Sequence, residues 1–256
     1  ALVSLTVNPQ PADVGGVIIS PASQLGFGTT NTFSPTWILA ANSLIEGVAP
    51  SSSVGNFTLE RAGGIPVLTD GRYGTLPPEG NASVELATCG RSANEAGSSI
   101  VYPLPAAPNG YDLTNVVIYG GWSDAGRDQQ QYYIYYSTVA NPADFANMIA
   151  YVNFYPTNDV NAQSATRVTI TGTNGVVARN AAAIKIDFDV LATATENGYT
   201  GYAEFQVFGK PSAPAPVLAV DTQPATGSDM EGGEVTFVAA FTSETPLRSS
   251  VPRVRA

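Results

Sequence analysis

The sequence predicts an all-β protein of two packed β-sheets, and its composition and its pattern of short apolar runs both support this fold class. Charged residues make up only 12% of the chain, while Gly and Pro number 25 and 19, which is the usage expected of many short strands joined by turns. From Ala82 onward, runs of β-branched and aromatic residues alternate with clusters of Gly, Asn, Asp and Pro. The predicted strands span residues 82–88, 99–104, 112–120, 130–138, 149–155, 165–171, 182–190 and 201–208.

Residues 183–190 have the clearest strand pattern. Ile184, Ile186 and Phe188 alternate with charged residues, so one side of this strand is predicted to face a core and the other to face water. The tyrosine-rich run 131–136 is also predicted to be a strand, because aromatic side chains suit a pleated surface.

A short helix is predicted after residue 140. Asn141 is a favourable N-cap, and Pro142 follows at the first helical position. We therefore expect one or two helical turns over residues 142–149.

Two changes in composition divide the chain. Residues 210–217 are rich in proline and predict a semi-rigid spacer. Residues 9–34 are rich in Gly, Pro, Ser and Thr, with one apolar run at 17–19, and predict a linker that holds a single strand at most. The predicted organisation is an N-terminal strand and linker at 1–37, a sandwich at 38–209, and a linker with a partial further segment at 210–256.

Charge and missing residue types exclude several kinds of function. The formal net charge is −10, which repels nucleic acid and anionic membrane surfaces. There is no histidine, so His-dependent triads and imidazole-ligated zinc sites are excluded. Cys89 is the single cysteine, so no internal disulfide forms, and no apolar run is long enough for a membrane span. Asn56 and Asn81 begin glycosylation acceptor sequences, which matter only in a source that glycosylates exported proteins.

Several motifs occur in a characteristic order: YDLT at 111–114, GWSDAGRD at 121–128, SATRVT at 164–169 and ENGYTGYAEF at 196–205. Together they resemble the discoidin, or coagulation-factor type C, superfamily of galactose-binding-domain-like proteins. The resemblance covers about two thirds of the chain and is closest to copies found in large surface proteins of environmental bacteria. It implies a jelly-roll β-sandwich with ligand-binding loops at one end.

The resemblance also implies a structural Ca²⁺ ion. The family's usual motif is Asp-Gly early in the domain and Glu in the last strand, which Asp70, Gly71 and Glu204 match here. A hard cation takes several oxygen ligands, so the assignment is chemically reasonable, although Asp70-Gly71 is equally typical of a simple turn. The implied ligands are the side chains of Asp70, Thr75 and Glu204 and the backbone carbonyls near Tyr73 and Ala203.

The loops of related carbohydrate-binding modules imply a glycan site. There an aromatic ring stacks on the sugar while Arg, Asn and carboxylates bond its hydroxyls. The histidine often used by galactose-specific members is absent here. An alternative is that Arg127 pairs with Asp128 or Glu196 and only braces the loops. The implied ligand-binding residues are Trp122, Asp124, Arg127, Asn197 and Tyr199.

The two ends of the chain resemble parts of an immunoglobulin-like repeat. Residues 217–247 look like its opening strands, and residues 1–9 look like its last strand. Neither end supplies the seven strands of a complete domain. The chain is therefore either one period of a string of modules or a subunit whose ends pair with its neighbours.

Three functions fit these observations. The favoured one is a secreted, non-catalytic carbohydrate- or surface-binding adhesion module, extracellular or on a cell surface, whose partner is a glycan or another cell-surface ligand. The alternative is a structural subunit of an extracellular filament or sheath, a homo-oligomer assembled head-to-tail through terminal strands at 1–8, 217–220 and 233–241. The third is a carboxylate enzyme such as a glycosidase or lyase that uses acids near Asp124, Asp128 and Glu196.

Overall fold

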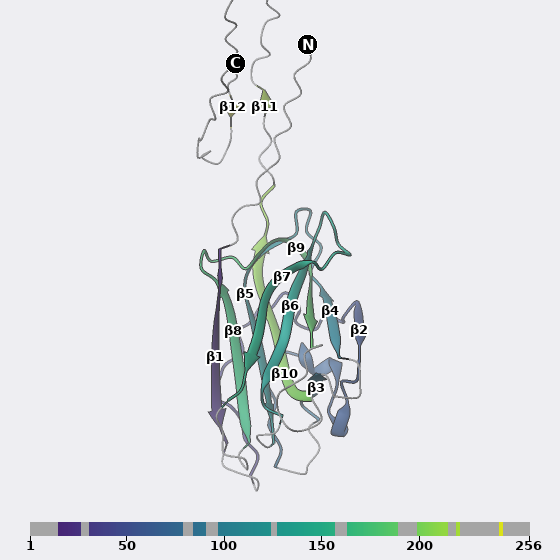
Figure 1. Ribbon diagram of the computed structural model, residues 1–256, viewed down its shortest axis with the longest axis vertical. Coiled ribbons are helices and arrows are strands. Elements are labelled where there is room, and N and C mark those ends of the chain that lie inside the picture. Colours follow the sequence, from purple (N-terminus) through teal and green to yellow (C-terminus); the bar gives the residue numbers. More distant parts are fainter. Residues whose placement is uncertain are drawn as a thin grey trace, which may run out of the picture. The chain divides into compact units, whose positions relative to one another are not determined.

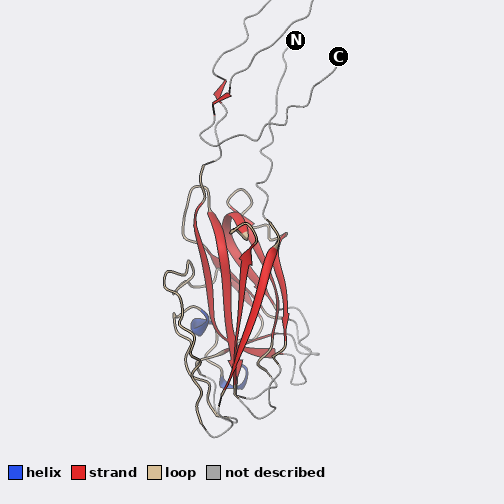
Figure 2. Cartoon of the chain, turned by 90° about the vertical axis from the view of Figure 1, so that its left-hand side faces the viewer, coloured by secondary structure: helices blue, strands red, loops and turns tan. Residues whose placement is uncertain are grey.

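The computed structural model describes residues 15–26, 31–78, 84–90, 97–123, 127–156, 163–188, 199–214, 219–220 and 241–242. They belong to two units, Ala1–Ser212 and Ala213–Ala256, which are described separately. The described part of the first unit is nearly all β, and its helices are two 3-10 turns, η1 (Leu59–Arg61) and η2 (Ile65–Leu68) (Figure 2). The predicted all-β class is confirmed. Neither 3-10 turn is long enough to cross a lipid bilayer.

One layer of the sandwich has the strand order β1–β8–β5–β10–β3 (Figure 1). All of its pairings are antiparallel, and β5 lies in the centre between β8 and β10. Its strands are β1 (Val17–Leu25), β3 (Ala87–Gly90), β5 (Tyr111–Trp122), β8 (Ser164–Gly172) and β10 (Tyr199–Pro211).

The second layer has the order β7–β6–β9–β4–β2 and is also antiparallel. It joins the first layer at one end, where Tyr111 and Leu113 of β5 pair with Ala181 and Ala178 of β9. Its strands are β2 (Ser52–Val54), β4 (Ser99–Pro103), β6 (Gln130–Thr138), β7 (Asn147–Phe154) and β9 (Ala178–Asp187).

The main core lies between the layers and follows from alternation along the strands. Ile118 of β5 and Ile134 of β6 are both fully buried in it. Ile184 and Ile186 are also fully buried, which confirms the predicted core side of 183–190. Burying each such side chain favours folding by about 1.5–3 kcal/mol.

The tyrosine-rich strand β6 is covered differently on its two sides. Tyr132 faces the core, where its ring meets those of Phe188 at 5.8 Å and Tyr202 at 6.0 Å in edge-to-face contacts. Tyr133 is partly exposed on the outer side and lies 4.7 Å from the ring of Tyr151 on β7. The strand prediction for 131–136 is confirmed.

A second, smaller core covers the outer side of the first layer. Val117 and Tyr119 point away from the main core and pack with Phe33, Tyr73 and other residues of the segments 31–48 and 69–78. The two segments are held together by reciprocal backbone hydrogen bonds between Phe33 and Leu76, of 3.0 and 2.8 Å. Both sides of β5 are therefore buried.

The predicted helix after residue 140 is wrong. Residues 139–146 form the turn between β6 and β7, closed by hydrogen bonds from the Asn141 N–H to the Thr138 carbonyl and from the Ala146 N–H to Asp144 Oδ1. Pairing of β7 with β6 begins at Asn147 and leaves no room for a helix.

Two predicted boundaries also shift. β1 lies within the region predicted as a linker, and it pairs with β8 along its whole length, so the sheet begins well before residue 38. The strand expected at 82–88 is β3, at Ala87–Gly90, after a turn at residues 84 and 85.

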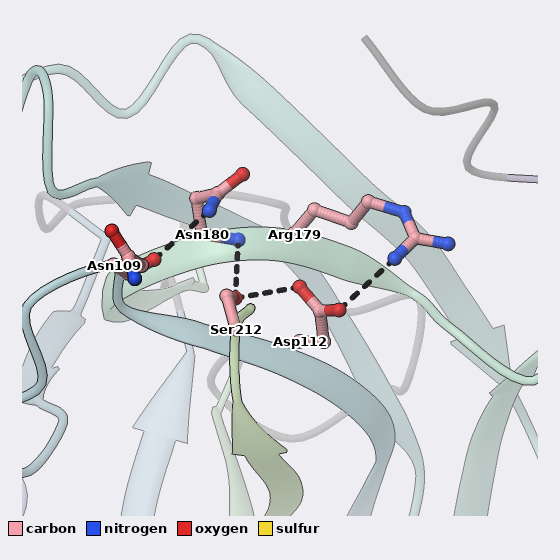
Figure 3. A network of polar contacts seen from close by, with 5 residues as sticks. All are labelled: Asn109, Asp112, Arg179, Asn180 and Ser212. Atoms are coloured by element: carbon pink, nitrogen blue, oxygen red, sulfur yellow. Dashed lines mark hydrogen bonds and ion pairs between the residues drawn. The ribbon is translucent and has the colours of Figure 1, made fainter. Parts of the chain in front are cut away.

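The first unit ends in a polar network that we call the Ser212 clasp, formed by Asn109, Asp112, Arg179, Asn180 and Ser212 (Figure 3). The Ser212 hydroxyl donates to Asp112 Oδ1 at 2.6 Å and accepts from the Asn180 N–H at 3.2 Å. Arg179 Nη1 pairs with Asp112 Oδ2 at 3.0 Å, and Asn180 Nδ2 donates to the Asn109 carbonyl at 2.9 Å. The end of β10 is thus fixed to β9 and to the start of β5.

The described part of the second unit is one short antiparallel pair. β11 (Ala219–Val220) pairs with β12 (Phe241–Thr242). The other residues on which the immunoglobulin-like resemblance and the terminal-strand assembly depend, at 1–9, 217–218, 221–240 and 243–247, lie outside the described residues. Filament assembly through these strands therefore stays a prediction.

Candidate functional site

Three of the residues expected to bind a ligand lie together at one end of the sandwich. Trp122 is the last residue of β5, Arg127 precedes β6, and Tyr199 is the first residue of β10. The Gly201 N–H donates to the Arg127 carbonyl at 2.9 Å, which holds the β5–β6 connection against β10. Strand pairing therefore brings these three side chains together from distant parts of the chain.

The three side chains enclose a guanidinium group. The Arg127 guanidinium carbon lies 5.5 Å from the centre of the Trp122 ring and 4.6 Å from the centre of the Tyr199 ring, so it is in cation–π contact with both. Trp122, Arg127 and Tyr199 are only 3%, 5% and 6% exposed. In this conformation Trp122 packs in the second core and offers almost no ring surface for stacking on a sugar.

Glu60 is an ionic partner of Arg127, and sequence reasoning missed it. Arg127 Nη1 pairs with Glu60 Oε2, and the Tyr199 hydroxyl donates to Glu60 Oε1 at 2.9 Å. The alternative that Arg127 braces the loops thus applies, with Glu60 as an ionic partner that was not expected. We call Glu60, Trp122, Arg127 and Tyr199 the rim cluster.

Glu60 has an unusual backbone and a well-defined charge. It lies in η1 with φ of 52°, in the left-handed region that non-glycine residues rarely adopt, and Arg61 follows at 61°. Its side chain is 48% exposed. The hydrogen bond from Arg127, assisted by that from Tyr199, lowers its pKa against the opposing effect of burial, so the carboxylate is ionised at neutral pH.

The other two expected ligand residues cannot be placed beside this cluster. Asp124 and Asn197 lie outside the described residues, and so does Glu196. Asp128 is described and fully buried.

The expected calcium ligands centre on Glu204. A bulge at Ala203 puts Glu204 opposite Tyr119 on the outer side of β10, where it is fully buried. Its Oε2 accepts from the Gly71 N–H at 3.2 Å, while its Oε1 has no hydrogen-bond partner among the described residues. Burial, followed by the nearby carboxylates of Asp70 and Glu46, raises the pKa of Glu204 to about 9.

The remaining expected ligands have other partners. The Tyr73 hydroxyl donates to the Gly120 carbonyl, and both the N–H and the hydroxyl of Thr75 donate to Glu85 Oε2. No group of three or more Asp, Glu, His or Cys side chains suitable for a metal occurs among the described residues. Of the expected side chains, the structure thus brings Asp70 and Glu204 together, and Thr75 is bonded elsewhere.

Comparison with known proteins gives little further help. No protein-family model matches the chain, and no curated protein sequence matches it. Among solved structures, it is similar to CBM32-3 from a family 31 glycoside hydrolase from Clostridium perfringens, with 19% sequence identity and a TM-score of 0.39 over 64% of this chain and 90% of that chain. At this identity and TM-score, function has to be inferred from the contacts within the chain itself.

Proposed function

We propose that this chain is a secreted, non-catalytic carbohydrate-binding module of a cell surface, and that its glycan binds at the rim cluster through Glu60. The observation that carries this proposal is the state of the Glu60 carboxylate. It is ionised and half-exposed, and its position is fixed by the ion pair with Arg127 and the hydrogen bond from Tyr199. A carboxylate held in this way accepts hydrogen bonds from sugar hydroxyls without first losing conformational freedom. The strained backbone at Glu60 and Arg61 is typical of a functional position.

The roles of the other rim residues follow from their burial. Arg127 and Tyr199 position Glu60, and Trp122 supports the guanidinium, so the ligand would meet the exposed carboxylate first. Asp124 and Asn197 stay in the proposed ligand set as donors and acceptors from adjoining loops.

A non-catalytic role agrees with the protonation of the carboxyl groups. Hydrolysis of a glycoside needs a protonated carboxylic acid that reaches the substrate. Glu60 is exposed but has a lowered pKa, whereas Glu204 has a raised pKa but is fully buried. Neither of these two groups therefore suits a general acid at the surface.

We also propose a structural Ca²⁺ ion held by Asp70 and Glu204, with oxygens near Tyr73, Thr75 and Ala203 completing its shell. Two features support it: the buried Glu204 Oε1 without a partner among the described residues, and an Asp70 whose pKa is also raised, chiefly by burial. A divalent cation would satisfy the free oxygen and neutralise both carboxylates. Its role would be to fasten the 69–78 segment to β10.

Substituting Glu60 tests the glycan proposal. On a glycan array, Glu60→Gln should weaken binding about tenfold to a hundredfold, because hydrogen bonds to a charged group are worth about 1.5–3 kcal/mol. The matched control is Asp144→Asn, which alters an exposed carboxylate in the β6–β7 turn and should leave binding unchanged.

Glu60→Gln also removes the ionic partner of a buried arginine, so its melting temperature must be measured alongside. Glu60→Asp keeps the charge but withdraws the carboxylate by one methylene, which should reduce binding with a smaller effect on stability. Wild-type binding in a folded Glu60→Gln protein, or no glycan binding by the wild type, would contradict the proposal.

A further inference from the structure

Four strands form the edges of the two layers within the described residues: β1, β2, β3 and β7. An open edge offers unpaired N–H and C=O groups to any extended chain, and natural proteins protect edges by shortness, proline or charge. β2 and β3 are three and four residues long, and β1 has Pro21, which lacks an N–H, at its middle. β7 has none of these protections.

β7 pairs with β6 on one side, and no described strand pairs with its other side. Its sequence, NMIAYVNF, contains neither proline nor charge. A bulge at Ile149 interrupts the pairing near its start, but Ala150–Phe154 then runs regularly against β6. We call Ala150–Phe154 the free β7 edge.

The described strands beside this edge carry no net charge, in contrast to the chain as a whole. The net charge of −10 makes two copies repel each other. Neither β6 nor β7 contains an Asp, Glu, Lys or Arg residue, and on the adjacent β9 Lys185 is paired with Asp187 at 2.8 Å. Within these described strands, a second copy can approach without like charges facing each other.

Exposed apolar side chains lie on this strand and directly after it. Met148 and Tyr151 of β7 are 55% and 38% exposed, and Tyr155, the residue after β7, is 53% exposed. Tyr and Met are enriched at protein interfaces, and covering them removes apolar surface from water. The edge therefore combines unpaired backbone groups with side chains that favour burial.

We propose that two copies of this chain join through the free β7 edge, in an antiparallel pair centred on Val152. The pair continues the β7–β6–β9–β4–β2 layer across a two-fold axis, and the contact is self-complementary. With this centre, Tyr151 of one copy lies opposite Asn153 of the other, and both are exposed positions of β7. Val152 itself stays in the core of each copy, where it is 1% exposed.

Analytical ultracentrifugation of the full chain over a concentration series tests this pair. The wild type should show a monomer–dimer equilibrium, and Asn153→Lys should weaken it at least tenfold because it places a charge in the new sheet. Ile18→Lys is the matched control, since Ile18 is 49% exposed on the β1 edge, and it should dimerise as the wild type does. A wild type that is monomeric throughout, or an Asn153→Lys protein that dimerises as tightly, would overturn the proposal.

A charge-pairing experiment tests the register. Tyr151→Asp alone should dimerise as weakly as Asn153→Lys alone. An equimolar mixture of the two variants should form heterodimers, because the introduced carboxylate of one chain then faces the introduced ammonium group of the other. If the mixture stays monomeric while the wild type dimerises, the proposed antiparallel pairing centred on Val152 is wrong. A monomeric wild type whose glycan binding is lost in Asn153→Lys would mean that a carbohydrate, not a second copy, occupies the edge.

Discussion

At the scale of single residues, the protonation state of the Glu204 carboxyl group is the property with the clearest consequences for stability. Glu204 is fully buried, with one carboxyl oxygen bonded to the Gly71 N–H and the other without a partner among the described residues. A carboxyl group in such a place is either protonated or neutralised by a cation. If Ca²⁺ binds as proposed, the titration of Glu204 should therefore differ between the calcium-free and the calcium-bound protein.

The stability of the calcium-free protein should depend on pH through Glu204. Its pKa is raised from an ordinary 4.5 to about 9, so over this range the folded protein keeps a proton that the unfolded chain has released. The free energy of unfolding should then fall as the pH rises from about 4.5 to about 9. Thermal melts in a chelator will measure this slope, which Glu204→Gln should flatten because the amide does not ionise.

Added calcium should reverse the effect in the wild type only. Because it would bind the ionised form in the folded state, Ca²⁺ should raise the melting temperature of the wild type at neutral and alkaline pH, whereas Glu204→Gln should gain little. Asp144→Asn serves as the control and should respond as the wild type does. An equal response to calcium in Glu204→Gln would exclude this carboxylate as a ligand.

At the scale of elements, the close crossing of β5 and β10 positions the rim cluster. A Cβ on Gly201 would collide with the Gly121 carbonyl and the Trp122 ring, so only glycine permits this approach. Gly201→Ala should lower stability by about 1–3 kcal/mol, as overpacking does. For a domain of this size each kcal/mol is worth about 2–4 °C in the melting temperature.

The comparison for this substitution is Gly16→Ala, where the nearest contact of a new Cβ would be an ordinary 3.9 Å to Thr173. It should melt close to the wild type. If the two variants melt alike, the close approach at Gly201 has no energetic consequence and the rim cluster does not depend on it.

Prediction from sequence succeeded for elements whose signal is local. β6 and β9 were predicted because alternation and aromatic content are visible within each strand. The apolar run 17–19 predicts at most one strand within a linker, but not the length of β1, because that length depends on pairing with β8. The first pair joins Val17 to Gly172, far along the chain. The helix at Asn141 failed for a similar reason, since pairing of β7 with β6 outweighs a favourable N-cap.

The candidate site was predictable to a similar extent. Trp122, Arg127 and Tyr199 stand at the ends of strands, so a resemblance in motif order was enough to bring them together. Glu60 lies 67 residues before Arg127 in a segment without strand or helix periodicity, and no local pattern marks it. The burial of Trp122 depends on the segments that cover β5, and these too have no periodic signal.

At the scale of the whole molecule, the first unit should be separable from the second just after the Ser212 clasp. A chain ending at Ser212 should keep the melting transition of the sandwich, because every contact of the clasp is retained. A chain ending at Gly209 loses the Ser212 contacts of the clasp and the pairing of Lys210 and Pro211 with β5, and it should melt at a lower temperature. Calorimetry of the two truncated chains will check this, and equal melting would show that the Ser212 contacts and the last pairs of β10 add nothing to stability.

The strand registers determine at which end the sandwich can be tethered. Val17 at the start of β1 lies in the same row as Gly172 of β8, next to the row that joins Thr171, Asn115 and Phe208, so the chain enters and leaves the sandwich at one end. Leu25, Ser164 and Trp122 share a row at the opposite end, beside the rim cluster. A support, dye or fused protein attached through the start of β1 or the end of β10 is therefore joined to the end remote from Glu60, and an immobilised sandwich can present its rim outward.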